Sequence, residues 1–438
     1  MRTWAWLCAL AAVIACVRPP GTEAGAETAP PAAGAQGGNV RPGITVLLDD
    51  SVHLVRGKRV GLLTNQTGID ERGRSDIDLL RDDPRATAAG VRLVTLYSPE
   101  HGIRGTEDRE DLASGVDERT GLVIHSLYTA GTSGPPDSTL RDLDVLVFDL
   151  QDIGTRTWTY VGNLVYALRA VKRTGKTLVV LDRPAPLDGV HRNGPMLDSA
   201  IANAEESVPG RPALAWALWP FPLRHGLTMG ELARFYNAEL GIGADLRVVP
   251  VAGWRRTMWF DETGLPWVRP SPNIPTLASA TLYPALVALE ATNVSVGRGT
   301  PLAHQLFGFP GLDAGAVVRA LDDRVLSGVR FEATEFTANR YGANQPYGGE
   351  RVPGVRIVVT DRDRLHVGRL GAAVISALVK TSPQGFRVVD TLRFDRLFGS
   401  GDARRALLAG EDPDTVIDRD LPATMAFERR ARQYLLYR

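Results

Sequence analysis

The chain has 438 residues, of which 50 are Lys or Arg and 50 are Asp or Glu, so its formal net charge is zero. A neutral chain lacks the basic excess of proteins that bind nucleic acids or polyphosphates, and we predict no nucleic-acid partner. Hydrophobic residues make up 44% and charged residues 23%, which excludes wholesale disorder and suits two or three domains of roughly 150 residues each.

Residues 1–40 have the composition of an export signal followed by a flexible tether rich in Pro, Gly and Ala. The uncharged stretch 4–17 is too short to span a bilayer of ~30 Å as a helix. Residues 13–16, Val-Ile-Ala-Cys, resemble a bacterial lipobox, and the alternative is an ordinary signal peptide cut after a later alanine such as Ala26. We therefore expect an exported protein, periplasmic or extracellular, with a lipid anchor at Cys16. The other cysteine, Cys8, also lies in this segment, so no disulfide is predicted in the folded part.

Short apolar runs, each followed by a polar loop, predict a buried parallel sheet covered on both faces. A helix is expected over 158–173, ended by Gly175. This strand–helix–strand order predicts a Rossmann-like α/β domain with a mostly parallel sheet. No Gly-x-Gly-x-x-Gly follows the strands, so we infer no dinucleotide cofactor. The predicted strands cover residues 59–64, 91–97, 143–148 and 177–181.

The second half of the chain predicts a smaller α/β or α+β domain. A capping box, Thr228-Met229-Gly230-Glu231, starts a helix. Residues 253–310 hold seven prolines and are predicted to be rich in loops. Further elements are expected at 246–251 (strand), 314–326 (helix), 355–360 (strand) and 367–380 (helix). We divide the chain into the signal and tether at 1–40, a Rossmann-like domain at 41–270 and a C-terminal domain at 271–438.

Polar residues follow all four predicted strands, where ligands of open parallel sheets bind. Amides and carboxylates hydrogen-bond sugar hydroxyls, and an Arg can clamp a substrate carboxylate. The alternatives are a turn role for Asn65 and a structural ion-pair network for the acidic and basic residues near 149–156. The candidates at these strand ends are Asn65, Gln66, Glu100, His101, Arg104, Asp149, Gln151, Asp152 and Arg156.

Glu100 carries the sharpest chemical signal because Pro99 and two nearby glycines constrain its loop. A carboxyl held in this way can act as a general acid or base. The alternative is a plain ion pair with Arg104. His101 can orient Glu100, bind substrate, ligate a metal or simply be buried.

A second group of candidates comes later in the chain: His225, Asn273, Glu290, Asn293 and Arg298. Glu290 follows an apolar stretch, so we expect it to project into a cleft between the domains, with an ion-paired Glu as the alternative. His225 is either a ligand or a neighbour of the helix cap. The tryptophans at 254, 259 and 267 either stack on sugar rings or fill the core.

Six motifs in one order resemble the exo-β-N-acetylmuramidase (NamZ-like) family over roughly residues 45–438. They are GLLTNQTG (61–68), SPEHG (98–102), FDLQDIGTR (148–156), HGLTMGEL (225–232), PSPNIPT (270–276) and TNVSVGRGT (292–300). Members of that family release terminal N-acetylmuramic acid from the non-reducing end of peptidoglycan fragments. The resemblance implies a Rossmann-like domain, a smaller C-terminal domain and a site in the cleft between them.

The resemblance assigns catalytic roles to Glu100, His101 and Glu290, and leaves the other candidates as substrate-binding residues. Ala291 stands where a Gly is expected and Ile274 where a Met is common. The partner of Glu100 is predicted to be Glu290, with Asp149 or Asp152, or the substrate's own 2-acetamido group, as alternatives. Arg104, Arg156 and Arg298 are the candidate partners for the lactyl carboxylate of muramic acid.

Two rival functions are a sugar-binding lipoprotein without catalysis and a metal-dependent hydrolase using His101 and His225. Neither His-x-His nor His-Glu-x-x-His occurs in the sequence, so no metal site is predicted.

Overall fold

The computed structural model describes residues 40–106, 112–128, 134–202, 216–339 and 346–438. The predicted signal, Cys16 and nearly all of the tether lie outside the described residues. Within these ranges, every helix is too short or too polar to cross a membrane.

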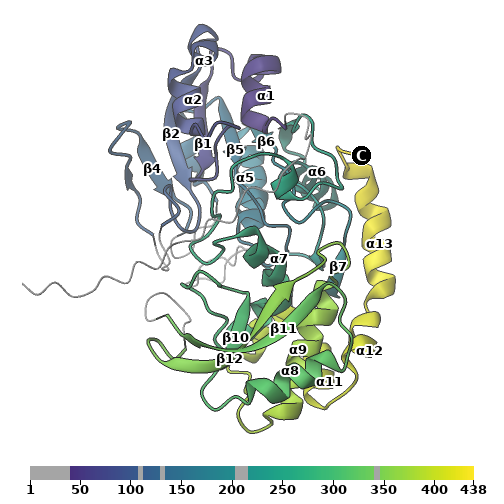
Figure 1. The fold of residues 1–438 in the computed structure, drawn as a ribbon. Helices are drawn as coiled ribbons and strands as arrows, with labels where there is room; N and C mark the ends of the chain where they lie inside the picture. The colour runs from purple at the N-terminus through teal and green to yellow at the C-terminus, as the bar shows by residue number, and fades with distance from the viewer. Residues whose placement is uncertain (1–39, 107–111, 129–133, 203–215, 340–345) are drawn as a thin grey trace, which may run out of the picture. The chain divides into compact units, whose positions relative to one another are not determined.

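A seven-stranded sheet forms the N-terminal part, in the order β3-β4-β2-β1-β5-β6-β9 (Figure 1). Every neighbouring pair is parallel except β3 and β4. The prediction of a mostly parallel α/β sheet is therefore confirmed. The strands are β1 (Arg59–Thr64), β2 (Arg92–Ser98), β3 (Gly115–Val116), β4 (Val123–Ser126), β5 (Val145–Asp149), β6 (Thr177–Leu181) and β9 (Asp245–Val249).

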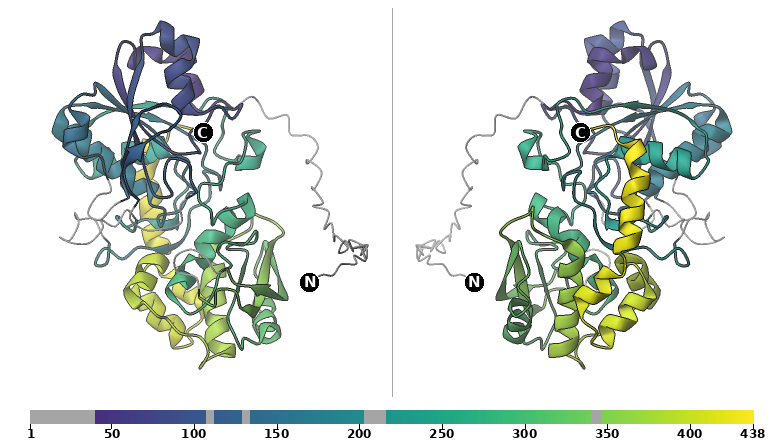
Figure 2. Two further views of the ribbon diagram at one scale, coloured as in Figure 1. Left: turned by 90° about the vertical axis from the view of Figure 1, so that its left-hand side faces the viewer. Right: turned by 90° about the vertical axis from the view of Figure 1, so that its right-hand side faces the viewer.

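Helices lie on both faces of the sheet (Figure 2). Alternate side chains of the strands enter two apolar clusters, one on each face. On β5, for example, Leu146 packs in the cluster of helices α5 and α6, and Val147 in that of α1, α2 and α3. Both faces are thus covered, as the unbroken apolar runs predict. The helices of this part are α1 (Gly43–Asp50), α2 (Asp76–Asp82), α3 (Pro84–Ala88), α4 (Asp137–Leu140), α5 (Tyr160–Thr174) and α6 (Met229–Glu239).

Two predicted helix ends are confirmed in detail. Gly175 ends α5 with φ of 66°, a left-handed conformation that glycine adopts without strain. Thr228 and Glu231 form both reciprocal bonds of a capping box at the start of α6.

Among the described residues, a three-stranded antiparallel sheet, β10-β12-β11, and seven α-helices make up the later part of the chain (Figure 1). Helix α8 packs against β11 and β12, which is an α+β arrangement. The elements are α7 (Leu277–Leu286), β10 (Leu306–Gly308), α8 (Ala314–Asp322), β11 (Val329–Thr337), β12 (Arg351–Val359), α9 (Val367–Thr381), α10 (Thr391–Phe398), α11 (Gly401–Leu408), α12 (Pro413–Asp418) and α13 (Leu421–Ala431).

Residues 253–310 are rich in loops, as predicted, but they also contain helix α7, which was not predicted. Thr276 caps this helix by accepting a hydrogen bond from the Ser279 backbone N–H. Pro284 lies inside this helix and has no N–H, so the helix forms in spite of one lost intrahelical hydrogen bond. The domain boundary placed at 270/271 stays a prediction.

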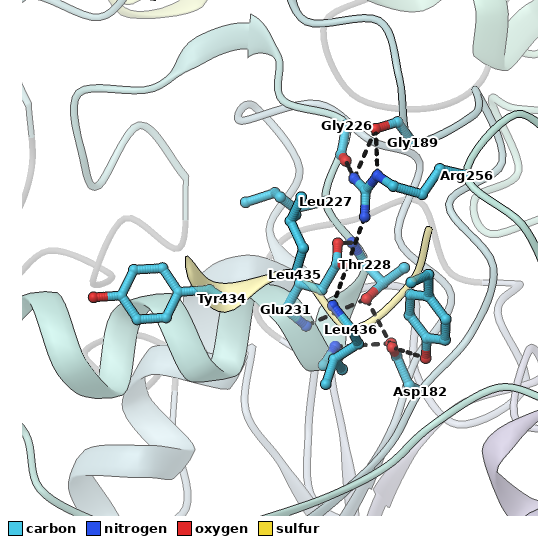
Figure 3. A network of polar contacts seen from close by, with 12 residues as sticks. Asp182, Gly189, Gly226, Leu227, Thr228, Glu231, Arg256, Tyr434, Leu435 and Leu436 are labelled. Carbon is cyan, nitrogen blue, oxygen red and sulfur yellow. Dashed lines mark hydrogen bonds and ion pairs between the residues drawn. The ribbon is translucent and has the colours of Figure 1, made fainter. Parts of the chain in front are cut away.

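The last residues of the chain return to the N-terminal sheet. The backbone N–H of Leu436 donates to Glu231 Oε1 at 2.9 Å, and Arg256 holds the same oxygen through Nη1 at 2.5 Å (Figure 3). The Tyr437 hydroxyl donates to Asp182 Oδ2 at 2.5 Å, at the carboxyl end of β6. A short two-stranded ribbon, β7 (Asn193–Met196) and β8 (Pro222–Arg224), completes the fold.

Candidate active site

Glu100 lies on the loop that follows β2, and one of its oxygens is held by the start of α5. The Thr159 hydroxyl donates to Glu100 Oε2 at 2.7 Å, and the Glu100 side chain is half-buried. The next residue, His101, is buried and has φ of 70°, which a non-glycine residue seldom adopts. The loop is therefore held in one unusual conformation, as its glycines predict.

Gln66 packs against the Glu100 loop from the end of β1. A Cβ atom on Gly105 would lie 1.9 Å from the Gln66 side chain, so only glycine allows this approach. Gln66 Nε2 donates to the Arg269 carbonyl at 2.8 Å. Arg104, on the same loop as Glu100, pairs with Asp117 and not with Glu100.

Asn65, just after β1, and Tyr160, at the start of α5, are linked by hydrogen bonds to residue 270. Asn65 Nδ2 donates to the Tyr160 hydroxyl at 2.8 Å, and that hydroxyl donates to the Pro270 carbonyl at 2.8 Å. Burial and the negative charges of Glu100 and Asp152 raise the pKa of Tyr160 well above its usual value. The phenol thus stays protonated beside Glu100.

An aromatic chain continues from Tyr160 towards Glu290. The ring of Trp158 meets Tyr160 and Tyr283 edge to face at 5.6 and 5.7 Å, and Tyr283 meets His304 at 4.8 Å. Burial, Glu290 and Glu100 all raise the pKa of Tyr283, so this phenol is within electrostatic reach of both carboxylates. Residues from both sides of the predicted boundary thus form one site.

Glu290, in the short helix Val287–Ala291, is surrounded by two arginines and a histidine. Its Oε2 lies 2.9 Å from Arg298 Nη1 and 3.5 Å from Arg393 Nη2, and its Oε1 lies 3.1 Å from His304 Nε2. Burial alone would raise the pKa of Glu290, but Arg298, His304 and Arg393 lower it to about 2. Glu290 is therefore an anion at neutral pH, in the ion-paired arrangement that was the alternative.

The carboxylates after β5 have structural partners. Asp149 is fully buried and pairs with Arg183 through both carboxylate oxygens, beside Asp76. Burial and the charge of Asp149 raise the pKa of Asp76 well above its usual value. The alternative of a structural ion-pair network describes Asp149 in this structure.

Asp152 and His225 form a second buried pair, at 3.5 Å between Oδ2 and Nε2. Asp152 Oδ2 also accepts a bond from the Gly154 backbone N–H at 2.6 Å, and His225 Nδ1 accepts one from Leu227 at 3.2 Å. Gln151, next to them, donates from Nε2 to the carbonyls of Asp152 and Pro184.

Two other predicted binding residues, Arg156 and Asn293, stabilise loops. Arg156 donates to carbonyls at the end of α10, at 2.7 Å to Arg396 and 2.6 Å to Phe398, and burial lowers its pKa to about 9. Asn293 Oδ1 accepts a bond from the Arg387 backbone N–H at 2.7 Å. Asn273, in contrast, lies inside the site, because its Oδ1 accepts from Gly299 and its carbonyl lies 3.3 Å from His304 Nδ1.

The structure adds site residues that sequence reasoning missed: Thr159, Tyr160, Tyr283, His304 and Arg393. Thr159 and Tyr160 directly follow a motif that was recognised, so extending that motif by four residues would have found them. No spacing in the sequence connects His304 or Arg393 with Glu290. Among the described residues, no group of three His, Cys, Asp or Glu side chains is arranged to hold a metal ion.

The tryptophans at 254 and 259 are buried, and both take part in core contacts. Trp254 packs edge to face on Tyr437, and Trp259 Nε1 donates to Asp363 at 2.8 Å. Trp267 is half-buried and meets the ring of Phe260 at 5.1 Å. All three therefore fill the core in this structure, which was one of the two expectations.

Comparisons with known proteins agree with the motifs. Family models described as the N-terminal and C-terminal parts of exo-β-N-acetylmuramidase NamZ match residues 60–278 and 281–437. The chain is 37% identical over 399 residues, 91% of each chain, to the peptidoglycan β-N-acetylmuramidase NamZ of Bacillus subtilis strain 168.

Two solved structures from Bacteroides fragilis, both of DUF1343 family proteins, have the same fold. One has a TM-score of 0.79 at 31% identity, and covers 91% of this chain and 99% of its own. The other has a TM-score of 0.71 at 25% identity, and covers 92% and 99%. The motifs, both family models and the curated relative together show that this chain belongs to the exo-β-N-acetylmuramidase NamZ family.

Proposed function

We propose that this protein is an exo-acting glycoside hydrolase that releases terminal N-acetylmuramic acid from the non-reducing end of peptidoglycan fragments. The observation that carries the proposal is Glu100, a half-buried carboxylate on a constrained loop, held by the Thr159 hydroxyl and within electrostatic reach of the Tyr160 and Tyr283 phenols. The 37% identity with a curated peptidoglycan β-N-acetylmuramidase supports the substrate class.

Glu100 is the central carboxylate in the mechanism that we propose. A glycosidase needs one group to protonate the leaving oxygen and a second to attack or to activate water. Glu290 holds no proton at neutral pH, since its pKa is about 2. Glu290 is therefore not the proton donor, and because its oxygens are held by Arg298, Arg393 and His304 we assign it an electrostatic role: it keeps Arg298 and His304 beside the substrate. The second reacting group is then either an anionic carboxylate or the substrate's 2-acetamido group.

Arg298 is our candidate for the lactyl carboxylate of muramic acid. Of the three predicted arginines, Arg104 pairs with Asp117 and Arg156 binds carbonyls of α10. Arg298 instead pairs with Glu290 inside the site, and its side chain keeps 14% of its exposure. A guanidinium can share two carboxylates because it has five N–H donors in a planar fork.

A release assay tests this function. The protein from residue 37 onward, which is one compact unit, is incubated with a chromogenic β-MurNAc glycoside and with the β-GlcNAc analogue, each with and without chelator. Release from the MurNAc glycoside alone, unchanged by the chelator, supports the proposal. Binding of the sugar by folded protein without any release supports the sugar-binding alternative. Loss of release with chelator supports the metal-dependent hydrolase.

We also propose export and a lipid anchor at Cys16, on the lipobox-like residues 13–16. Cys16→Ser is expected to move the full chain from the membrane fraction to the soluble exported fraction. Mass spectrometry of the mature N-terminus identifies the cleavage site. A chain that starts after Ala26 would show an ordinary signal peptide and contradict the lipid anchor.

A further inference from the structure

Thr159 occupies the N-cap position of α5 but does not cap the helix. An N-cap threonine usually has an extended backbone, and its side-chain oxygen accepts a bond from an N–H of the first turn. Thr228 and Thr276 do this for α6 and α7. Thr159 has helical angles, φ of −70° and ψ of −22°, and its side chain makes no capping bond.

The hydroxyl of Thr159 is directed to Glu100 instead. A threonine hydroxyl has a single hydrogen to donate, and here it goes to Glu100 Oε2 at 2.7 Å, across 59 residues of sequence. The neighbouring hydroxyls of Thr155 and Thr157 contact each other at 3.2 Å. The Glu100 carboxylate thus lies at the N-terminal end of a 15-residue helix, where the helix dipole is positive.

We infer that Thr159 is a positioning residue for Glu100. Its hydroxyl bonds one carboxylate oxygen instead of capping the helix, and the other carboxylate oxygen is left for the substrate. The inference rests on the proposed function for its catalytic consequence. The contact joins the loop after β2 to the rigid start of α5, whose first turn also supplies Tyr160. One helix start therefore orients both the carboxylate and the phenol next to it.

The titratable neighbours of Glu100 include His101 and Arg104 on its own loop, Tyr160 on α5 and Tyr283 on α7. Arg104 is engaged by Asp117. Neither phenol ionises near neutral pH, because burial and the nearby carboxylates raise both pKa values. A change in the pH profile of a Thr159 variant can therefore be attributed to Glu100 and not to these phenols.

The test compares Thr159→Val, which keeps the shape and removes the hydroxyl, with Thr159→Ser, which keeps the hydroxyl. The kcat of the Val variant is expected to fall roughly tenfold to hundredfold with KM changed less than about twofold. The limb of its pH profile that depends on Glu100 is expected to move to higher pH, because the carboxylate loses a donor. The Ser variant is expected to restore both.

Ser75→Ala is the matched control, since Ser75 caps α2 through its hydroxyl and accepts from Ile77. It is expected to lower the melting temperature without moving the pH profile. If Thr159→Val behaves in the same way, with activity lost only in proportion to folded protein, Thr159 is merely structural and the inference is wrong.

A second measurement does not need turnover. Carboxyl ¹³C NMR of glutamate-labelled protein, with Glu100→Gln used to assign the signal, follows Glu100 directly in wild type and in Thr159→Val. A shifted titration in the Val variant confirms the contact, and an unchanged titration overturns it. A wild type that binds but never releases sugar contradicts the proposed function instead.

Discussion

Glu100 belongs to one family motif and Glu290 comes two residues before another, yet their surroundings differ. Glu100 is half-buried, and the partner of its Oε2 is a neutral hydroxyl. Glu290 is buried to 7% exposure between Arg298, Arg393 and His304. The chemical type of a residue in a motif thus does not decide its role. The partners of the two carboxylates differ: two guanidinium groups stabilise the charge of Glu290 more strongly than one neutral hydroxyl stabilises that of Glu100.

The largest effect on activity is expected from replacing Glu100. Glu100→Gln removes the group that we propose exchanges a proton or attacks, so kcat/KM is expected to fall by about 10²- to 10⁴-fold with little change in melting temperature. Turnover of the chromogenic β-MurNAc glycoside measures the loss, and thermal melting checks the fold. Glu335→Gln, on the exposed strand β11, is the control. A folded Glu100→Gln protein with full turnover would remove Glu100 from the mechanism.

Replacing Glu290 is expected to lower the stability of the fold more than the activity. Glu290→Gln leaves Arg298 and Arg393 without their anion, and breaking a buried ion pair in this way is expected to cost roughly 3 kcal/mol of unfolding free energy. Urea denaturation measures this cost. Activity, compared well below the melting temperature, is expected to fall less than in Glu100→Gln. The opposite order of the two activity losses would contradict the comparison.

The elements of the fold that were predicted from the sequence are those with strong local signals. The parallel strands and the capping box of α6 were predicted because apolar runs and caps are local signals. The strand β11 was missed because its residues alternate between exposed and half-buried positions without a strong apolar run. Helix α7 was missed because its proline and the prolines around it indicate loops.

The site was predictable only in part, for a physical reason. The ends of parallel strands meet at one edge, so Asn65 and Glu100 were found from the positions of the strands. What decides their chemistry comes from distant segments. The Thr159 hydroxyl lies 59 residues from Glu100 along the chain, and the Arg393 guanidinium lies 103 residues from Glu290. Such contacts exist only after packing, so a list of polar residues cannot separate a reacting carboxylate from an ion-paired one.

The unfolding free energy measured at several pH values tests whether Glu290 is an anion in the folded protein. Its folded pKa of about 2 lies below the value of ~4.3 for an unfolded Glu, so the unfolded chain binds the proton first. The resulting stability is fully present above about pH 5 and is lost as the pH falls towards 2. The difference in unfolding free energy between wild type and Glu290→Gln is therefore expected to shrink between pH 6 and pH 3. A constant difference would show that the ion pairs do not cause it.

Asp182 allows the effect of burial to be compared with the effect of partner type. It is more deeply buried than Glu290 but, like Glu100, accepts bonds from hydroxyls. Burial raises the pKa of Asp182 to about 7, against bonds from Tyr437, Gly230 and Thr228 that lower it (Figure 3). The folded state then keeps a proton that the unfolded chain releases near pH ~4, so this group lowers stability as the pH rises from 4 to 7.

The smallest effect that we predict follows from this network. Tyr437→Phe removes a donor to Asp182 and the acceptor of the Val251 N–H, which is expected to cost about 1 kcal/mol. The cost is expected to be larger at pH 8 than at pH 5, because only the ionised carboxylate loses a charge-assisted bond. Tyr434→Phe is the matched control, since its hydroxyl serves Glu239 near the surface. Equal costs for the two variants at both pH values would mean that the hydroxyl does not support the Asp182 charge, and that burial alone sets this carboxylate apart from Glu100.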